Sequence, residues 1–221
     1  MNKDEFQNFM TLLYAKNLTC KLAGDHALFV DNANVYMIID RKPDYLDEKN
    51  IELMKEREIF GHFFKEPKLD SIDYIHSSIR LTQIEKQKKY GKKHDDFYYM
   101  VGRIDNHILF STISDSGSHI DVDLDVLESL DLPEQRDITT FLGHDIVSDI
   151  ISVMRFFRRT GIYMDRFNLS FGEDVPVILE DERFKIYIAP RMVDASDTLR
   201  MIEVIKENIY NNGIGTFETD E

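Results

Sequence analysis

Hydrophobic and polar residues follow two periods along this chain, and the longer period marks the helices. Residues 4–15 carry apolar side chains at helical spacing: Phe6, Phe9, Met10 and Leu13. Residues 145–158 place a second apolar set on one face: Ile146, Ile150, Val153, Met154 and Phe157. Because an α-helix turns every 3.6 residues, this spacing predicts amphipathic helices. Three further segments are predicted to be helical: 44–66, 69–90 and 197–211.

Short apolar segments separated by turn residues mark the strands. The first half contains three of them: residues 18–24, 26–31 and 34–41. The second half contains six: residues 96–105, 107–114, 118–127, 167–171, 175–181 and 183–191. The pair Asp105-Asn106 predicts a hairpin turn between two of these strands. Helices that alternate with groups of short antiparallel strands predict an α+β fold, with the helices packed on one face of the sheets.

The composition is that of a folded chain. Hydrophobic residues make up 43% of the 221 residues and charged residues 31%, which is not a disordered composition. Cys20 is the single cysteine, so we expect a reducing, intracellular location, cytoplasmic or nucleoid-associated. No basic leader precedes an apolar run, and no stretch approaches 18 apolar residues. We therefore expect neither a signal peptide nor a membrane span.

Charge is sorted into opposite regions of the chain. The net charge is −14, which by itself argues against binding to a phosphate backbone. Residues 79–94 nevertheless hold six basic residues and one acidic residue, and residues 154–160 hold three arginines and no acid. Residues 114–137 show the reverse, with eight acidic residues against one arginine. Because the distribution matters more than the sum, a nucleic-acid surface on the basic segments stays open.

The last strands carry a recognisable motif. The segment 169–172 reads Leu-Ser-Phe-Gly, Pro176 follows, and residues 187–192 read Tyr-Ile-Ala-Pro-Arg-Met. Together with the helix before them, these residues resemble the final third of a sliding clamp of the proliferating-cell-nuclear-antigen type. The resemblance covers residues 69–192, and residues 1–68 are too few for a standard first domain. Members of the family encoded by viruses can be this short.

Two weaker similarities to the same family lie in the middle of the chain. Residues 103–124 resemble the hairpin of the family's second domain, and residues 123–135 resemble its acidic interdomain connector. The two interpretations exclude each other in the family's usual register, and the hairpin is preferred. Edge strands must pair between subunits for a ring to close, and we expect residues 107–114 or 167–171 to serve.

The resemblance implies a DNA sliding clamp, or polymerase processivity factor, that encircles duplex DNA as a homotrimer and has no catalytic activity and no cofactor. It implies three parts: a divergent clamp-like half over 1–68, a clamp-like half over 69–196, and a C-terminal helix and acidic tail over 197–221. The expected DNA-facing residues lie in the basic segments: Arg80, Lys86, Lys88, Lys89, Lys92, Lys93, Arg155, Arg158 and Arg159. Short peptides of a DNA polymerase and other partners are expected at a second set: Leu130, Leu132, Ile188, Ala189, Pro190, Arg191 and Met192.

Purely structural interpretations also account for several of these residues. Arginines at the end of a helix also complement its dipole, the lysine run also fits a solvated loop, and Pro190 also fits the end of an edge strand. An acidic protein that binds basic partners or mimics DNA is a second hypothesis. The run Lys86–Lys93 counts against it.

Two segments of the sequence resemble metal sites. His144-Asp145 is the pair found in HD-type metal-dependent phosphohydrolases, where further ligands would be needed; the available ones are His62, His76, His94, His107, His119 and Asp149. Asp145 is equally expected to cap a helix that begins at Ile146. Asp121–Asp125 resembles the start of a calcium loop, but Val126 and Leu132 stand where that loop needs glycine and glutamate. We therefore expect no bound metal.

Overall fold

A computed structural model describes residues 3–16, 18–23, 27–31, 35–39, 74–129, 136–161, 165–173, 175–182 and 184–212. Its strands form one eleven-stranded antiparallel sheet in the order β1-β2-β3-β11-β10-β9-β4-β7-β6-β5-β8. The strands are β1 (Thr19–Ala23), β2 (Ala27–Asp31), β3 (Val35–Ile39), β4 (Ile75–Arg80), β5 (Tyr98–Ile104), β6 (His107–Asp115), β7 (Ile120–Ser129), β8 (Ile138–Gly143), β9 (Arg166–Phe171), β10 (Val177–Glu180) and β11 (Phe184–Ile188). The helices are α1 (Lys3–Ala15), α3 (Leu81–Gly91), α4 (His144–Arg159) and α5 (Ala195–Asn211).

One unit of structure occurs twice between residues 75 and 188. The first copy runs β4-α3-β5-β6-β7, and the second runs β8-α4-β9-β10-β11. The first strand of each copy pairs with a strand of the other copy: β4 pairs with β9, and β8 pairs with β5. The ends of the copies also meet in matching ways: β7 touches β4 through Ser77 and Ser78, and Arg191, just after β11, bridges to Phe141 of β8. The two copies are therefore related by an approximate twofold axis.

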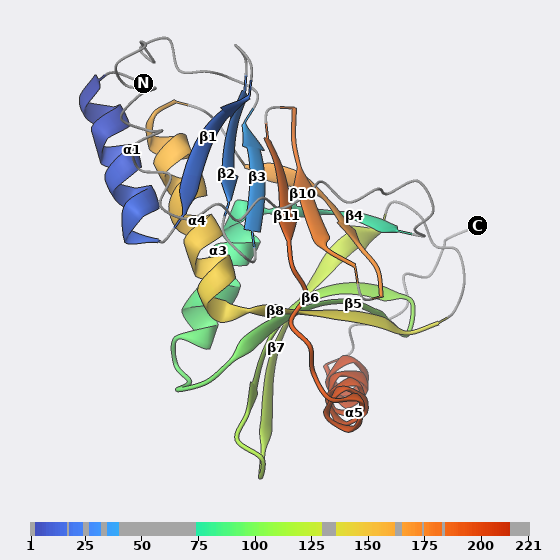
Figure 1. Ribbon diagram of the computed structural model, residues 1–221. Helices are drawn as coiled ribbons and strands as arrows, with labels where there is room; N and C mark the ends of the chain where they lie inside the picture. Colours follow the sequence, from blue (N-terminus) through green and yellow to red (C-terminus); the bar gives the residue numbers. More distant parts are fainter. Residues whose placement is uncertain are drawn as a thin grey trace.

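The N-terminal segment adds a third, shorter group of elements to this pair. Its strand β3 pairs with β11 over five residues, from Val35 opposite Ile188 to Ile39 opposite Phe184. Its helix α1 packs on α4, with the Phe9 ring 5.3 Å from that of Phe156. The main hydrophobic core lies between the helices α1, α3 and α4 and one face of the sheet. These three helices lie on the same side in Figure 1.

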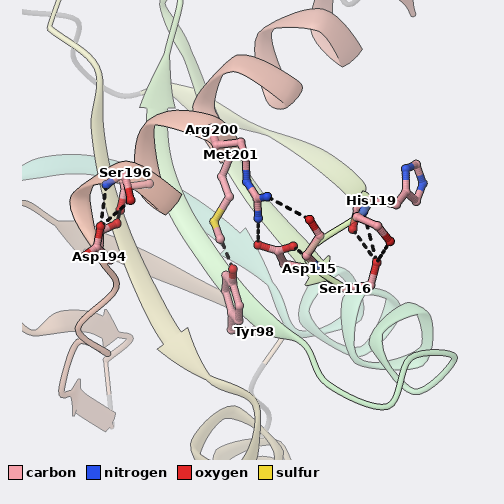
Figure 2. Close-up of polar contacts among 11 residues, drawn as sticks. Tyr98, Asp115, Ser116, His119, Asp194, Ser196, Arg200 and Met201 are labelled. Atoms are coloured by element: carbon pink, nitrogen blue, oxygen red, sulfur yellow. Dashed lines mark hydrogen bonds and ion pairs between the residues drawn. The ribbon is translucent and has the colours of Figure 1, made fainter.

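Helix α5 covers the opposite face of the sheet and creates a second core. Met201, Ile205 and Ile209 of α5 pack against apolar residues of β5, β6 and β8. This double coverage explains why all seven residues of β5 are buried. Polar contacts hold α5 in place, as Figure 2 shows: Arg200 pairs with Asp115 at the end of β6, and the Tyr98 hydroxyl donates to Met201 Sδ at 3.1 Å.

The predicted fold class is confirmed, with α5 as the exception to helices on one face. The hairpin turn at Asp105-Asn106 is confirmed too, since both residues have positive φ, as a tight turn between strands requires. The helix over 197–211 is present and starts two residues earlier than predicted, at Ala195. The helix predicted over 44–66 lies outside the described residues.

Three predictions about single segments were wrong, and one strand was not predicted. Residues 75–80 form β4 and not the first turns of a helix, because two neighbouring strands satisfy their backbone groups. Residues 138–143 form β8, a strand that the sequence analysis did not predict. Residues 123–129 lie within β7, so they are no interdomain connector. Helix α4 begins at His144 with Gly143 as its N-cap, so Asp145 lies in the first turn and is not the cap.

The strands expected to close a ring are both internal. Strand β6 lies between β5 and β7, and β9 lies between β10 and β4. Neither has a free edge for another subunit, because a strand in a sheet pairs with two neighbours at most.

The end of α3 depends on one glycine. A Cβ atom at Gly91 would lie 2.2 Å from the Phe97 ring, which is buried beneath it. We expect Gly91→Ala to lower the free energy of unfolding by about 1–3 kcal/mol, because the ring must move in a packed core. Urea denaturation measures this, with Lys92→Ala on the exposed side as the control. Equal stability of Gly91→Ala and the wild type would contradict the predicted close packing.

Candidate nucleic-acid interface

Helices α3 and α4 lie side by side on one face of the sheet and present the two basic segments together. Lys88 of α3 donates from Nζ to Ser148 Oγ of α4 at 2.6 Å, and Arg155 of α4 donates to Glu85 of α3 at 2.6 Å. Each helix buries its apolar side against the core. The structure thus brings together cations that lie about 60 residues apart in the sequence.

The expected DNA-facing residues differ in their exposure and in whether they form ion pairs. Lys89, Lys92, Arg158 and Arg159 are exposed, and within the described part of the chain they form no ion pair. Lys93 is exposed and lies over the Tyr90 ring, 5.0 Å from its centre. Arg80 is an exposed residue at the end of β4, directly before α3. These cations all lie on α3, on α4 or on the residues that flank the two helices.

Two aspartates of β7 face α3 and neutralise its first lysine. Lys86 Nζ lies 2.7 Å from Asp125 Oδ1 and 3.8 Å from Asp123 Oδ2. The amide of buried Gln87 donates to the same two carboxylates at 2.9 Å. The hydrogen bond and charge of Asp125 raise the pKa of Lys86 above its usual value. Asp123 and Asp125 of β7 are therefore bound to a helix, whereas Asp121 pairs with His119 in the hairpin.

The charges around Lys88 indicate a positive potential between α3 and α4. Burial lowers its pKa below the usual value, and the positive charges of Lys92, Arg155 and Lys16 lower it further. Lys16 follows α1 and pairs with Asp149 of α4 at 2.8 Å. Such crowding of like charges favours a bound anion, because an anion would relieve the repulsion. Lys16, Gln87 and Ser148 are site residues that the sequence analysis did not identify, since nothing in the sequence places α1 beside α4.

The segment after β11 forms one wall of a groove on the α5 side. Pro190, Arg191 and Met192 line it, together with β8 and α5, and the groove encloses about 400 Å³. Met192 and Leu199 are 81% and 64% exposed there. Ala189 is half-buried, whereas the Ile188 side chain is buried in the main core. Leu130 and Leu132 lie outside the described residues. Leu199 and Ile202 of α5 are groove residues that the sequence analysis did not identify.

The histidines considered as metal ligands do not gather in the described part of the chain. His144 lies 2.9 Å from its neighbour Asp145 and packs on the Phe97 ring, while His76 contacts Ser170. His119 and His94 both face Asp121, at 3.0 and 4.0 Å. His107 contacts the Asp105 carbonyl, and His62 lies outside the described residues. Within the described residues, no three His, Cys, Asp or Glu side chains are placed to hold one ion.

Among the described helices, none is long and apolar enough to cross a membrane.

Comparison with known proteins gives a match in structure and none in sequence. No family model matches the chain, and a search of curated proteins gives no match. The PCNA2–PCNA3 complex of Sulfolobus tokodaii is similar with a TM-score of 0.55 at 13% identity, over 85% of this chain and 96% of that one. PCNA from Thermococcus kodakaraensis is similar with a TM-score of 0.50 at 10% identity, over 85% and 97%. A putative DNA polymerase III beta subunit from Eubacterium rectale has a TM-score of 0.51 at 14% identity, over 80% and 57%.

The fold that these structures share is the sliding-clamp fold, and this chain has it.

Proposed function

We propose that this protein is a clamp subunit that binds duplex DNA without regard to sequence and tethers a DNA polymerase or another DNA enzyme to it. The observation that carries the proposal is the joint basic surface of α3 and α4 within a sliding-clamp fold. Exposed lysines and arginines on helices bind phosphates through contacts that exchange easily and that carry no sequence information. The acidic remainder of the chain keeps DNA away from other surfaces.

The groove beside Pro190 is the proposed site for partner peptides. Its walls offer exposed Met192 and Leu199 to an apolar anchor, and half-buried Pro190 to the peptide backbone. Short motifs commonly bind in this way, with an apolar side chain in a pocket and main-chain pairing beside it. The proposed subunit therefore holds DNA on its helical face and its partners near the opposite face.

Fluorescence anisotropy with two duplexes of unrelated sequence tests the DNA part of the proposal. We expect equal affinities for both, and a steep linear fall of log K with log salt, about 0.9 for each phosphate contact. A second arm compares release from closed circular and linear DNA, since a topological link holds only on the circle. Absence of binding at low salt, or a strong preference for one sequence, would overturn the proposal.

The aspartates of β7 are predicted to restrain DNA binding. Asp125→Asn keeps an acceptor for Gln87 but removes the charge beside Lys86. We expect the affinity for duplex DNA to rise roughly threefold to tenfold at low salt, because one more cation becomes available to phosphate. The control is Glu203→Gln, which removes an equal charge from the exposed side of α5. An affinity that rises equally in both variants would show that only net charge matters.

A further inference from the structure

The two copies of the repeated unit differ on the sheet face that lies away from α1, α3 and α4. In the first copy, Met100 of β5 lies opposite Phe141 of β8, and both belong to the second core beneath α5. In the second copy, exposed Asn168 of β9 lies opposite Ser78 of β4 at the matching place. Ser78 precedes Phe141 by 63 residues, just as the start of α3 at 81 precedes that of α4 at 144. The repeated unit therefore does not require an apolar outer face, and the apolar residues of the first copy serve to receive a helix.

Helix α5 docks on that face through one apolar stripe. Met201, Ile205 and Ile209, spaced four residues apart, are its buried residues. The second core that they form is separate from the main core. The side of α5 that faces away from the sheet is exposed, as at Glu203 and Tyr210. Of the 17 residues that become ordered, few are therefore held by apolar burial.

The composition of α5 does not favour a helix on its own. Five of its 17 residues are β-branched: Thr198, Ile202, Val204, Ile205 and Ile209. Such residues lose side-chain freedom in a helix, and an isolated helix of about this length is marginal in water. Helix α5 is therefore stabilised by docking. Elements with few buried apolar contacts open locally while the rest of the protein stays folded.

Acids at both ends of the face bind the cations of α5. Arg200 pairs with Asp115 at the end of β6 (Figure 2). Further along the helix, Lys206 Nζ lies 2.7 Å from Asp137 Oδ2 and 3.3 Å from Asp105 Oδ1. The face therefore fits an apolar helical stripe that has a cation before its first residue and another after its second.

We propose that the face formed by β5, β6 and β8 is a docking site for an amphipathic helix of a partner protein, and that α5 is the internal occupant which this helix displaces. The partner helix carries apolar residues at positions i, i+4 and i+8 and cations at i−1 and i+5, as α5 does from Met201. The site lies on the face opposite α3 and α4, so the inference goes beyond DNA binding. Because Leu199 and Ile202 line the groove beside Pro190, the departure of α5 also removes one wall of that groove.

Binding of the α5 segment as a separate peptide tests the inference. The probe is a fluorescein-labelled synthetic peptide of residues 194–212, and the protein is the full chain with Arg200→Glu/Lys206→Glu, whose own α5 is repelled by the aspartates. We expect anisotropy to give this variant a dissociation constant about tenfold lower than that of the wild type, or lower still. In the wild type α5 occupies the face, and only the opened fraction can bind the probe. Equal binding to both proteins, or binding to neither, would overturn the proposal.

Two altered peptides separate a specific site from general attraction to an acidic protein. Arg200→Gln/Lys206→Gln removes both cations from the peptide and should weaken its binding about tenfold. Leu199→Glu/Tyr210→Glu lowers the charge of the peptide by the same amount, at side chains that are 64% and 87% exposed in α5, and should bind as the unaltered peptide does. An equal loss with both peptides would mean that net charge alone attracts the probe, which contradicts the proposal.

Hydrogen exchange of the wild type provides a second test that needs no variant. We expect the amides of α5 to show protection factors about tenfold lower than those of β5, because α5 opens locally. Equal protection of α5 and β5 would mean that α5 leaves only on global unfolding, and the proposal would be wrong.

Light scattering of the wild type with excess peptide tests whether a second copy of the chain is the occupant instead. We expect the mass to stay the same apart from bound peptide. A fall in mass would show that α5 is exchanged between copies, and the proposed partner would be wrong.

Discussion

Reversing the exposed cations of the helical face is expected to weaken DNA binding about a hundredfold while the protein stays folded. The two double variants are Lys89→Glu/Lys92→Glu on α3 and Arg158→Glu/Arg159→Glu on α4. Each should lower the affinity for duplex DNA by about a hundredfold at low salt, because two phosphate contacts become repulsions. Each should also reduce the slope of log K against log salt by about two. Anisotropy titrations at four or more salt concentrations give both quantities.

The stability of these variants should change little. All four side chains are exposed, and within the described residues none of them forms an ion pair, so substitution is expected to cost less than about 0.5 kcal/mol. The control is Arg136→Glu/Arg191→Glu, an equal change of charge at two exposed positions outside α3 and α4; Arg136 pairs with Glu173, so the stability of this variant is measured as well. If the control weakens DNA binding as much as the helix variants do, the effect is one of net charge, and α3 and α4 are not the interface.

The closing strands were predictable because motif and periodicity agree there. Residues 166–188 form β9, β10 and β11 close to the predicted limits, and α4 buries Ile150, Val153, Met154 and Phe157 as its spacing indicated. The sequence predicts a helix over 69–90, yet residues 75–80 form β4. Its buried side chains include Ser77 and Ser78, whose place in the sheet comes from pairing with β9 and β7. Tertiary pairing decided the conformation against the local pattern.

The candidate site could be read from the sequence in its composition but not in its arrangement. The sequence identified the cations of both basic segments, yet it could not tell that Lys86 is held by Asp125 while Lys89 is exposed. That difference depends on β7 lying against α3, which follows from strand register. The same holds for α5: its helical period was visible, but the face it covers is built from β5, β6 and β8, more than 50 residues away.

Among the substitutions proposed for this protein, one that weakens the packing of α5 is expected to lower the free energy of unfolding most. Ile205 is fully buried between α5 and the sheet, where it packs in the second core. We expect Ile205→Ala to lower the free energy of unfolding by about 2–5 kcal/mol, from lost apolar burial and the cavity left behind. Urea denaturation gives the value, and Leu199→Ala is the control on the same helix because that side chain is 64% exposed. A cost for Ile205→Ala no larger than for Leu199→Ala would contradict the docked position of α5.

A tyrosine beneath the helix reports docking independently of stability. Burial, with the charges of Asp115 and Asp197, raises the pKa of Tyr98 to about 12 from 10.0. Its neutral form is favoured in the docked state, so the stabilisation is complete below pH 10 and is lost as the pH rises towards about 12. Ile205→Asp places an unpaired carboxylate in the second core, and we expect it to release α5 and return the Tyr98 pKa towards 10. Absorbance titration of tyrosinate against a Tyr98→Phe reference follows the change; an unchanged titration in Ile205→Asp would mean that α5 does not control this face. Release would uncover the apolar face of β5, β6 and β8, so we expect Ile205→Asp to aggregate more readily than the wild type.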